Sequence, residues 1–199
     1  MKQGKIILIV ISILLISSAV YAQGITAKGI KGGINIATLT GDDVEDAESK
    51  IGLVLGGFVS YAVNETFCIQ PEVLFTMKGA KFSGQGYDVT QSLNYIEIPI
   101  LAKLNIAMDG NAQPNLFFGP AIGLNLSATY KVESDFGDDD GDIEDVSPMD
   151  FGIVFGGGVE FGKILIDARY DMGLTSIDDS SENFKVNNSV ISIMLGILF

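Results

Sequence analysis

Residues 67–78 read FCIQPEVLFTMK, and their hydrophobicity alternates with a period of two residues. Every odd position of this stretch is apolar, whereas the even positions are mostly polar and end in Lys78. Successive side chains of a β-strand point to opposite faces, so the stretch predicts a strand with one apolar and one polar face. Residues 164–174, ILIDARYDMGL, repeat the pattern with Asp167, Arg169 and Asp171 on the polar face.

The same two-faced pattern occurs eight times after residue 22. Tight turns and longer loops alternate between these segments, and the longer loops contain 17 of the 25 acidic residues. Short turns at one rim and long loops at the other are typical of outer-membrane barrels. The predicted strands are 26–39, 51–62, 66–79, 92–106, 115–131, 150–161, 164–175 and 187–199; the tight turns are 63–65, 107–114 and 162–163; the loops are 41–50, 80–91, 132–149 and 176–186.

Soluble, lipocalin-like barrels also alternate, so the sidedness of the strands depends on further features. The polar face carries nine glycines, among them Gly56 and Gly156, and a narrow lumen needs such small residues. The apolar face is nearly unbroken along 96–106 and 191–199, which suits contact with lipid. Its aromatic residues gather toward the strand ends, as in interfacial girdles. We therefore predict an all-β fold, an eight-stranded antiparallel up-and-down transmembrane β-barrel.

The N-terminus is predicted to be an export signal. Two lysines precede an apolar run at 6–16, and Ala22 closes a Val-Tyr-Ala sequence of the kind that a signal peptidase reads. The run is shorter than the roughly 20 residues that a membrane-spanning helix needs, so cleavage after Ala22 is favoured over a retained anchor. The predicted domains are a signal peptide at 1–22 and an outer-membrane barrel domain at 23–199.

Composition excludes several classes of function. The 199 residues carry a formal net charge of −13, no histidine, and Cys68 as the single cysteine. A strongly acidic chain does not suit the phosphate backbone, so no nucleic-acid partner is expected. The absence of histidine excludes Ser-His and Asp-His catalysis, and one cysteine excludes an internal disulfide and a multi-thiolate zinc site. We predict a protein that is not an enzyme and needs no cofactor.

Charged residues of both signs lie on the predicted inward face, where a partly dehydrated lumen strengthens their attraction. Arg169 lies two residues from both Asp167 and Asp171, so at least one carboxylate is within its reach. One interpretation is a polar conductance path or a proton relay. The favoured interpretation is a structural plug of ion pairs that fills the barrel. The predicted lumen charge network consists of Lys31, Glu72, Lys78, Glu97, Lys103, Glu160, Asp167, Arg169 and Asp171.

An acidic run at 138–142, DDDGD, suggests calcium, because hard cations bind carboxylate oxygens. An EF-hand register with Gly141 in the sixth position would place Phe136 first and Ser147 twelfth, and it fails at both ends. A solvated acidic loop is therefore favoured, and no metal ligands are assigned. The alternative is weak binding of divalent cations, which would bridge to lipopolysaccharide phosphates.

Three prolines, Pro71, Pro99 and Pro120, lie within predicted strands. Proline cannot donate to the hydrogen-bonded ladder, so a bulge or a local break is expected at each. Cys68, on the polar face, is interpreted as a small residue that fills space in the lumen.

Several segments together resemble the PorT-like outer-membrane β-barrel family of Bacteroidetes-type bacteria. They are QPEVLF at 70–75 with KGA at 78–80, YIEIP at 95–99, FGGGVE at 155–160, DARY at 167–170 and GIKGG at 29–33. The resemblance implies an eight-stranded barrel and, for most members, no assigned reaction; one branch assists a dedicated secretion system. The terminal Phe199 is similar to the signal that the outer-membrane assembly machinery reads.

The sequence thus predicts a small, monomeric, non-enzymatic protein of the bacterial outer membrane. Its role would be structural or interaction-mediating through acidic extracellular loops. The expected partners are outer-membrane lipid and the assembly machinery, with divalent cations at the acidic loops as an option. The alternatives are an accessory component of a secretion system and a narrow pore, although an eight-stranded lumen is usually filled by side chains. An outer-membrane enzyme has the least support.

Overall fold

A computed structural model describes residues 24–41, 44, 47–84, 86–135, 137–178 and 185–199. The predicted signal peptide at 1–22 and its cleavage site lie outside these residues. No helix in the described part of the chain is long and apolar enough to cross a membrane. The strands are β1 (Ile25–Thr40), β2 (Glu48–Ala62), β3 (Phe67–Gly84), β4 (Tyr87–Asn105), β5 (Ala112–Ser134), β6 (Asp139–Asp142), β7 (Met149–Phe161), β8 (Ile164–Gly173) and β9 (Asn187–Leu198).

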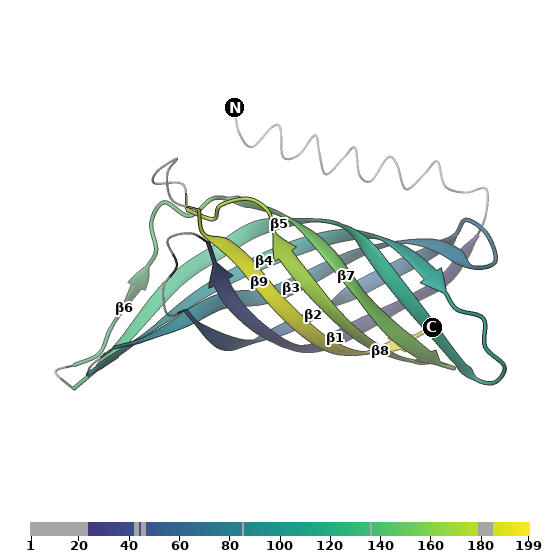
Figure 1. Cartoon of the computed structure of the whole chain (residues 1–199), viewed down its shortest axis with the longest axis horizontal. Helices are drawn as coiled ribbons and strands as arrows, with labels where there is room; N and C mark the ends of the chain where they lie inside the picture. The colour runs from purple at the N-terminus through teal and green to yellow at the C-terminus, as the bar shows by residue number, and fades with distance from the viewer. Residues whose placement is uncertain (1–23, 42–43, 45–46, 85, 136, 179–184) are drawn as a thin grey trace, which may run out of the picture.

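Eight of these strands form a closed antiparallel ring (Figure 1). Sequential strands pair with one another, β5 pairs directly with β7, and β1 pairs with β9 from Gly29–Leu198 to Thr40–Asn187. The short β6 lies outside the ring, where its described partner is β5. The predicted eight-stranded up-and-down barrel is confirmed, and β6 is the strand that the sequence did not indicate.

The ring has two different ends. At the turn end, short connections join β2 to β3, β4 to β5 and β7 to β8, and Phe199 N donates to Lys28 O close by. At the loop end, β3, β4 and β5 continue past their neighbours, because they pair with one another as far as Gly84–Tyr87 and Tyr87–Ser134. We call this extension the projecting sheet (Figure 1); it comprises residues 80–84, 87–94, 127–134 and 139–142.

The prediction of a long loop at 80–91 is wrong. β3 and β4 run through this stretch and are joined by residues 85–86 alone. Its backbone groups pair across β3, β4 and β5, so the strands gain ladder hydrogen bonds well beyond the length that a membrane requires. The predicted loop at 132–149 is also partly strand, since it holds the end of β5 and all of β6.

The three prolines interrupt the ladder without shifting its register. The register runs through Pro71, Pro99 and Pro120 without a shift, so the predicted bulges are absent there. Paired positions are nevertheless missing between Pro71 and Leu74 of β3 and between Pro99 and Ala102 of β4, which are the predicted local breaks. The missing amide hydrogen of each proline removes a donor from the ladder but leaves the strand extended.

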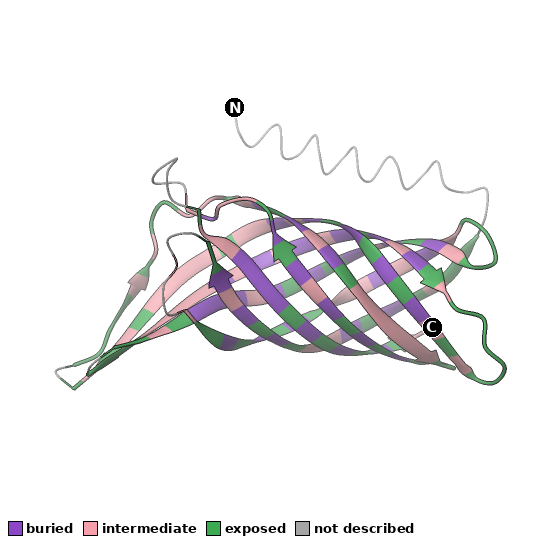
Figure 2. Cartoon of the chain, viewed as in Figure 1, coloured by how far each residue is buried: buried purple, intermediate pink, exposed green. Residues whose placement is uncertain are grey.

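Burial alternates along the strands and gives the ring its two faces (Figure 2). The outward face is apolar and open, as shown by Ile51 at 73% and Leu195 at 62% exposure. An apolar surface of this extent is not tolerated in water, whereas lipid matches it. The inward face is buried and carries most of the buried polar residues, so the predicted sidedness is confirmed.

Candidate functional site

The central cluster lies in the lumen and joins Lys31 of β1, Glu72 of β3, and Asp167 and Arg169 of β8. Lys31 Nζ is 2.7 Å from Glu72 Oε1 and 2.9 Å from Asp167 Oδ2. Arg169 Nη1 is 2.8 Å from Glu72 Oε2, and Nη2 is 2.6 Å from Asp167 Oδ2. All four residues are buried. Each carboxylate therefore meets both cations, and the four formal charges cancel inside the barrel.

Aromatic rings support the two cations of the central cluster. The Arg169 guanidinium lies 5.0 Å from the Phe117 ring centroid, and Lys31 Nζ lies 5.4 Å from that of Phe58. A Cβ on Gly156 would come within 2.8 Å of the Phe117 ring, so a larger residue at this position would displace the ring. The glycine-rich strand β7 thus makes room for the side chains that hold Arg169.

A second group of charges, the outer cluster, lies closer to the loop end and is not balanced. Lys78 Nζ is 2.6 Å from Glu97 Oε2, 2.5 Å from Asp171 Oδ2 and 3.7 Å from Asp150 Oδ2. Asn188 Nδ2 donates to Asp150 Oδ2 at 2.8 Å. All these residues are buried, and three carboxylates face one described cation. The outer cluster therefore carries a formal excess of two negative charges.

Packed layers separate and cover these clusters. Leu74, Val54 and Met194 form one buried apolar group, and Leu101, Phe117, Ala121 and Val154 form another. Asn35 bridges β3 and β9, since its Nδ2 donates to Thr76 Oγ1 and its Oδ1 accepts from Ser192 Oγ, both at 2.8 Å. Toward the loop end, a third group, the mouth cluster, consists of Leu39, Ala80, Leu93, Tyr95 and Ile177. Side chains thus fill the described lumen at several levels.

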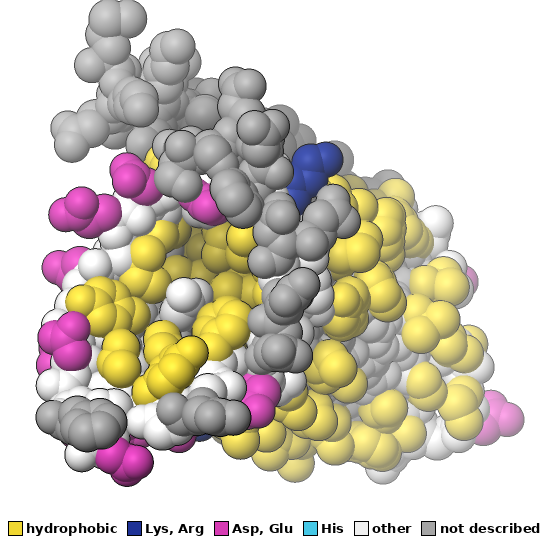
Figure 3. Space-filling view, turned by 60° about the vertical axis from the view of Figure 1, so that its left-hand side comes forward, with side chains coloured by type: hydrophobic (Ala, Val, Ile, Leu, Met, Phe, Trp, Pro, Cys, Tyr) yellow, Lys and Arg dark blue, Asp and Glu magenta, His cyan; other side chains and the backbone are white. Residues whose placement is uncertain are grey.

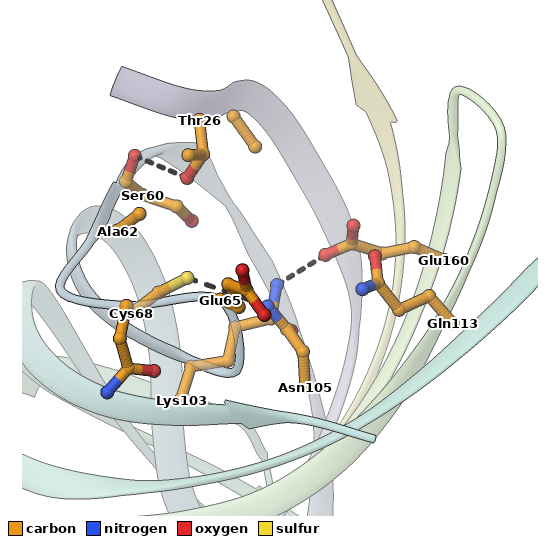
Figure 4. Close-up of a pocket in the computed structure, with 11 residues that line it drawn as sticks. Thr26, Ser60, Ala62, Glu65, Cys68, Lys103, Asn105, Gln113 and Glu160 are labelled. Carbon is orange, nitrogen blue, oxygen red and sulfur yellow. Dashed lines mark hydrogen bonds and ion pairs between the residues drawn. The ribbon is translucent and has the colours of Figure 1, made fainter. Parts of the chain in front are cut away.

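The turn end holds a cavity of about 270 Å³ that is lined mostly by polar residues (Figure 4). Lys103 reaches Glu160 across it and also lies 3.4 Å from Gln70 Oε1, while Gln70 Nε2 donates to Glu72 Oε1 at 2.7 Å. A polar chain therefore leads from the cavity to the central cluster and ends at its ion pairs. Cys68 lines the cavity as a buried free thiol that accepts from Asn105 Nδ2, which fits its interpretation as a filler.

The structure places all nine residues of the predicted charge network on the inward face, in three groups instead of one. Arg169 bonds to Asp167 and to Glu72, whereas Asp171 bonds to Lys78 and Glu160 to Lys103. Arg169 thus bonds to one of the two aspartates on its own strand, as the prediction of at least one carboxylate within reach required. Pairing across the lumen, which the sequence does not display, decides the partners.

Sequence reasoning missed Asp150 and Asn188. Asp150 is the first residue of the predicted strand 150–161, and its parity with Gly152 and Val154 would have placed it on the inward face. Asn188 is the second residue of β9 and is neutral, so a search for charges did not find it.

The loop end is strongly acidic (Figure 3). Lys131 of β5 is paired with Glu133 at 2.5 Å, and both side chains are 56% exposed. The charge of Asp139 raises the pKa of the Tyr130 hydroxyl, which contacts this carboxylate at 3.4 Å. The described residues include no group of three or more side chains placed to hold a metal ion. The exposed acids are Glu48, Asp88, Glu133, Asp135, Asp138, Asp139, Asp140, Asp142, Glu144 and Asp145, and the exposed lysines are Lys81, Lys131 and Lys185.

Phe199 lies at the turn end and is 63% exposed, with Lys28 Nζ 5.8 Å from its ring centroid. Its side chain contributes little to the filled lumen. Its role in assembly remains a prediction.

Comparison with known proteins relates this chain to outer-membrane β-barrels. A family model described as outer membrane protein beta-barrel domain matches residues 21–179. Neisserial surface protein A (NspA) is similar in structure, with a TM-score of 0.52 and 14% identity over 89% of this chain and all of that chain. Ail of Yersinia pestis matches with a TM-score of 0.42 and 14% identity over 87% of this chain and 98% of that chain. The N-terminal barrel domain of Pseudomonas aeruginosa OprF matches with a TM-score of 0.34 and 10% identity over 87% of this chain and all of that chain.

No curated protein matches the chain. The family model covers most of the sequence, and the ring with its apolar outer face explains how the protein is held in lipid. The protein is located in the bacterial outer membrane, and the chain belongs to the outer membrane protein beta-barrel domain family.

Proposed function

We propose that this protein is a sealed, non-enzymatic barrel that acts as an interaction surface at its loop end. The observation that carries the proposal is the filled lumen. The central cluster, the outer cluster and the mouth cluster occupy successive levels of the described interior, and each is buried. Small solutes would have to break buried ion pairs to pass, and opening such a pair costs several kcal/mol, about 3–5 when one partner is lost.

The loop end supplies the surface. Barrels of this kind carry their longer loops on the extracellular side, so the acidic end faces outward. Its described exposed charged residues are ten acids and three lysines. A field of one sign attracts cationic partners and speeds their association. Divalent cations are included among these partners as loosely held ions, because the acids are spread over several strands and loops.

A narrow pore and an enzyme have weaker support. The polar chain from the turn-end cavity ends at the central cluster, which argues against conduction. The sequence has no histidine for acid-base catalysis near neutral pH. Membership in the PorT-like branch, and with it a role beside a secretion system, rests on the five sequence segments alone. We therefore favour a monomeric barrel that acts on its own over a component of a secretion system.

Two measurements on the purified barrel in lipid test the proposal. Single-channel recording in planar bilayers should show no stable open steps, because the lumen is filled. Poly-L-lysine should bind to the barrel in nanodiscs of zwitterionic lipid, and added salt should weaken the binding because the attraction is electrostatic. Changing Asp138, Asp139, Asp140 and Asp142 together to asparagine should also weaken it. Stable ion conductance, or binding that is indifferent to both salt and these substitutions, would refute the proposal.

A further inference from the structure

The projecting sheet has one face that continues the inner wall of the barrel. Leu93 of β4 pairs with Ala128 of β5, and both belong to or pack against the mouth cluster. Two and four residues farther out, the same face of β4 carries Gln91 and Val89. Phe82 of β3 pairs with Val89, which pairs with Val132 of β5, so an apolar row crosses three strands. We call this surface the mouth face.

Aromatic rings extend the mouth face over glycines. A Cβ on Gly84 would meet the Tyr87 ring at 2.4 Å, and one on Gly141 would meet the Tyr130 hydroxyl at 2.9 Å. Both rings therefore lie flat across a neighbouring strand that lacks a side chain. Tyr87 is 51% exposed, whereas Phe82 is partly buried against the mouth cluster. The sheet thus presents apolar and aromatic surface above the membrane, where lipid does not explain it.

The margin of the mouth face is acidic. β6 contributes Asp139, Asp140 and Asp142, all exposed, along one side of the projecting sheet. Figure 3 shows the loop end as a hollow with apolar side chains inside and acidic side chains around it. Charges on an edge strand discourage the addition of another strand. A partner is therefore expected on the face of the sheet and not along its edge.

Dimensions narrow the choice of partner. Three strands at the usual spacing are about 10 Å across, which matches the diameter of one α-helix with its side chains, about 10–12 Å. An apolar strip of this width with negative charge beside it is complementary to a helix that has one apolar face and flanking lysines or arginines. We propose that the mouth face binds a cationic amphipathic helix of a partner polypeptide. This inference rests on the proposed interaction role of the loop end and names the partner's chemistry.

Peptide binding to the full barrel in nanodiscs of zwitterionic lipid tests the inference. The probe is a fluorescent 14-residue peptide of leucine and lysine with all leucines on one helical face, read by anisotropy against empty nanodiscs. A second peptide has the same composition with the leucines scattered around the helix, and a third has glutamate in place of lysine. We expect binding of the first peptide at least tenfold tighter than that of either control.

Two variants and a matched control locate the site. Phe82→Ser with Val132→Ser should weaken the first peptide about tenfold, because the apolar row is lost. Asp139→Asn with Asp140→Asn should weaken it at low salt and reduce its salt dependence. Thr90→Ala with Thr129→Ala changes the opposite face of the same sheet and should leave binding within about twofold.

Hydrogen exchange on the unmodified protein provides a test that does not depend on whether the variants fold. Bound peptide should slow amide exchange at 80–92 and 127–134 and leave β8 unchanged. Equal binding of the three peptides, an unchanged affinity of a folded Phe82/Val132 variant, or no protection of these segments would overturn the inference. Polylysine binding that survives such a result would leave the proposed function standing. An open channel would instead refute the proposed function whatever the peptide does.

Discussion

Replacing Arg169 by leucine tests the balance of charge inside the barrel. Arg169 donates four hydrogen bonds, two to Asp167 at 3.0 and 2.6 Å and two to Glu72 at 2.8 and 3.3 Å. The substitution leaves Lys31 alone with two carboxylates and gives the central cluster a buried negative charge. Losing one partner of a buried ion pair costs about 3–5 kcal/mol. We expect the free energy of unfolding to fall by that amount.

Partner substitutions make the result specific. Asp167→Asn in the Arg169→Leu chain removes the excess charge and should restore part of the lost stability. Asp171→Asn should change the stability of the Arg169→Leu chain by the same amount as that of the unmodified chain, because Asp171 bonds to Lys78 in the outer cluster and not to Arg169. The matched control is Lys131→Leu at the exposed pair with Glu133, where a change of about 0–1 kcal/mol is expected.

Guanidinium unfolding of the barrel in lipid vesicles, followed by tyrosine fluorescence and gel mobility, supplies these free energies. A loss for Arg169→Leu no larger than that for Lys131→Leu would refute the buried ion-pair assignment. An effect of Asp171→Asn that depends on Arg169 as strongly as the effect of Asp167→Asn would refute the partner assignment while leaving the burial intact. The first outcome would test whether Arg169 is buried in an ion pair, and the second would test which carboxylate is its partner.

Four further predictions concern closure, assembly and the loop end. The unboiled protein should migrate differently from the boiled protein in a detergent gel, because a closed ring has no edge from which to unzip; identical mobility would contradict the closed ring. Deleting Phe199 should lower the amount of protein inserted in the outer membrane, as measured by fractionation; normal insertion would reject the assembly signal but not the barrel. Asp139→Asn should lower the pKa of Tyr130 toward its ordinary value, because the carboxylate charge raises it; absorbance titration reads this, with Tyr130→Phe to identify the signal. Asp150→Asn should raise the unfolding midpoint, because three carboxylates share Lys78 and asparagine keeps an acceptor for Asn188; a lowered midpoint would count against this account of the outer cluster.

The ring and its sidedness could be predicted because both follow from local rules. Period-two alternation in stretches such as 67–78 assigns a face to each residue, and the face persists along a strand. Glycines opposite an unbroken apolar row distinguish a lumen from a water-facing exterior. Both signals can be read from neighbouring residues of one strand. They do not depend on which residues face each other across the barrel.

The projecting sheet and the charge partners could not be predicted, because both depend on contacts between residues that are far apart in the sequence. Residues 80–91 look like a loop because they contain two glycines and several polar residues, yet ladder hydrogen bonds among β3, β4 and β5 hold them extended. Arg169 bonds to Glu72, which is 97 residues away in sequence and lies across the lumen. The register that brings these two side chains together depends on the stagger of the strands around the ring. Alternation fixes a side chain's face but not its height along the barrel axis.

The distribution of charge along the axis argues for a surface function over a conducting one. At the loop end, the described exposed residues hold a formal excess of seven negative charges, and the outer cluster below them adds two more. Low-dielectric walls strengthen such a field and draw cations toward the mouth. The central cluster cancels its own charge, however, so the attraction does not continue through the barrel. A cation should therefore be attracted to the loop end and find no path through the central cluster, which supports the proposed role of the barrel as a binding surface.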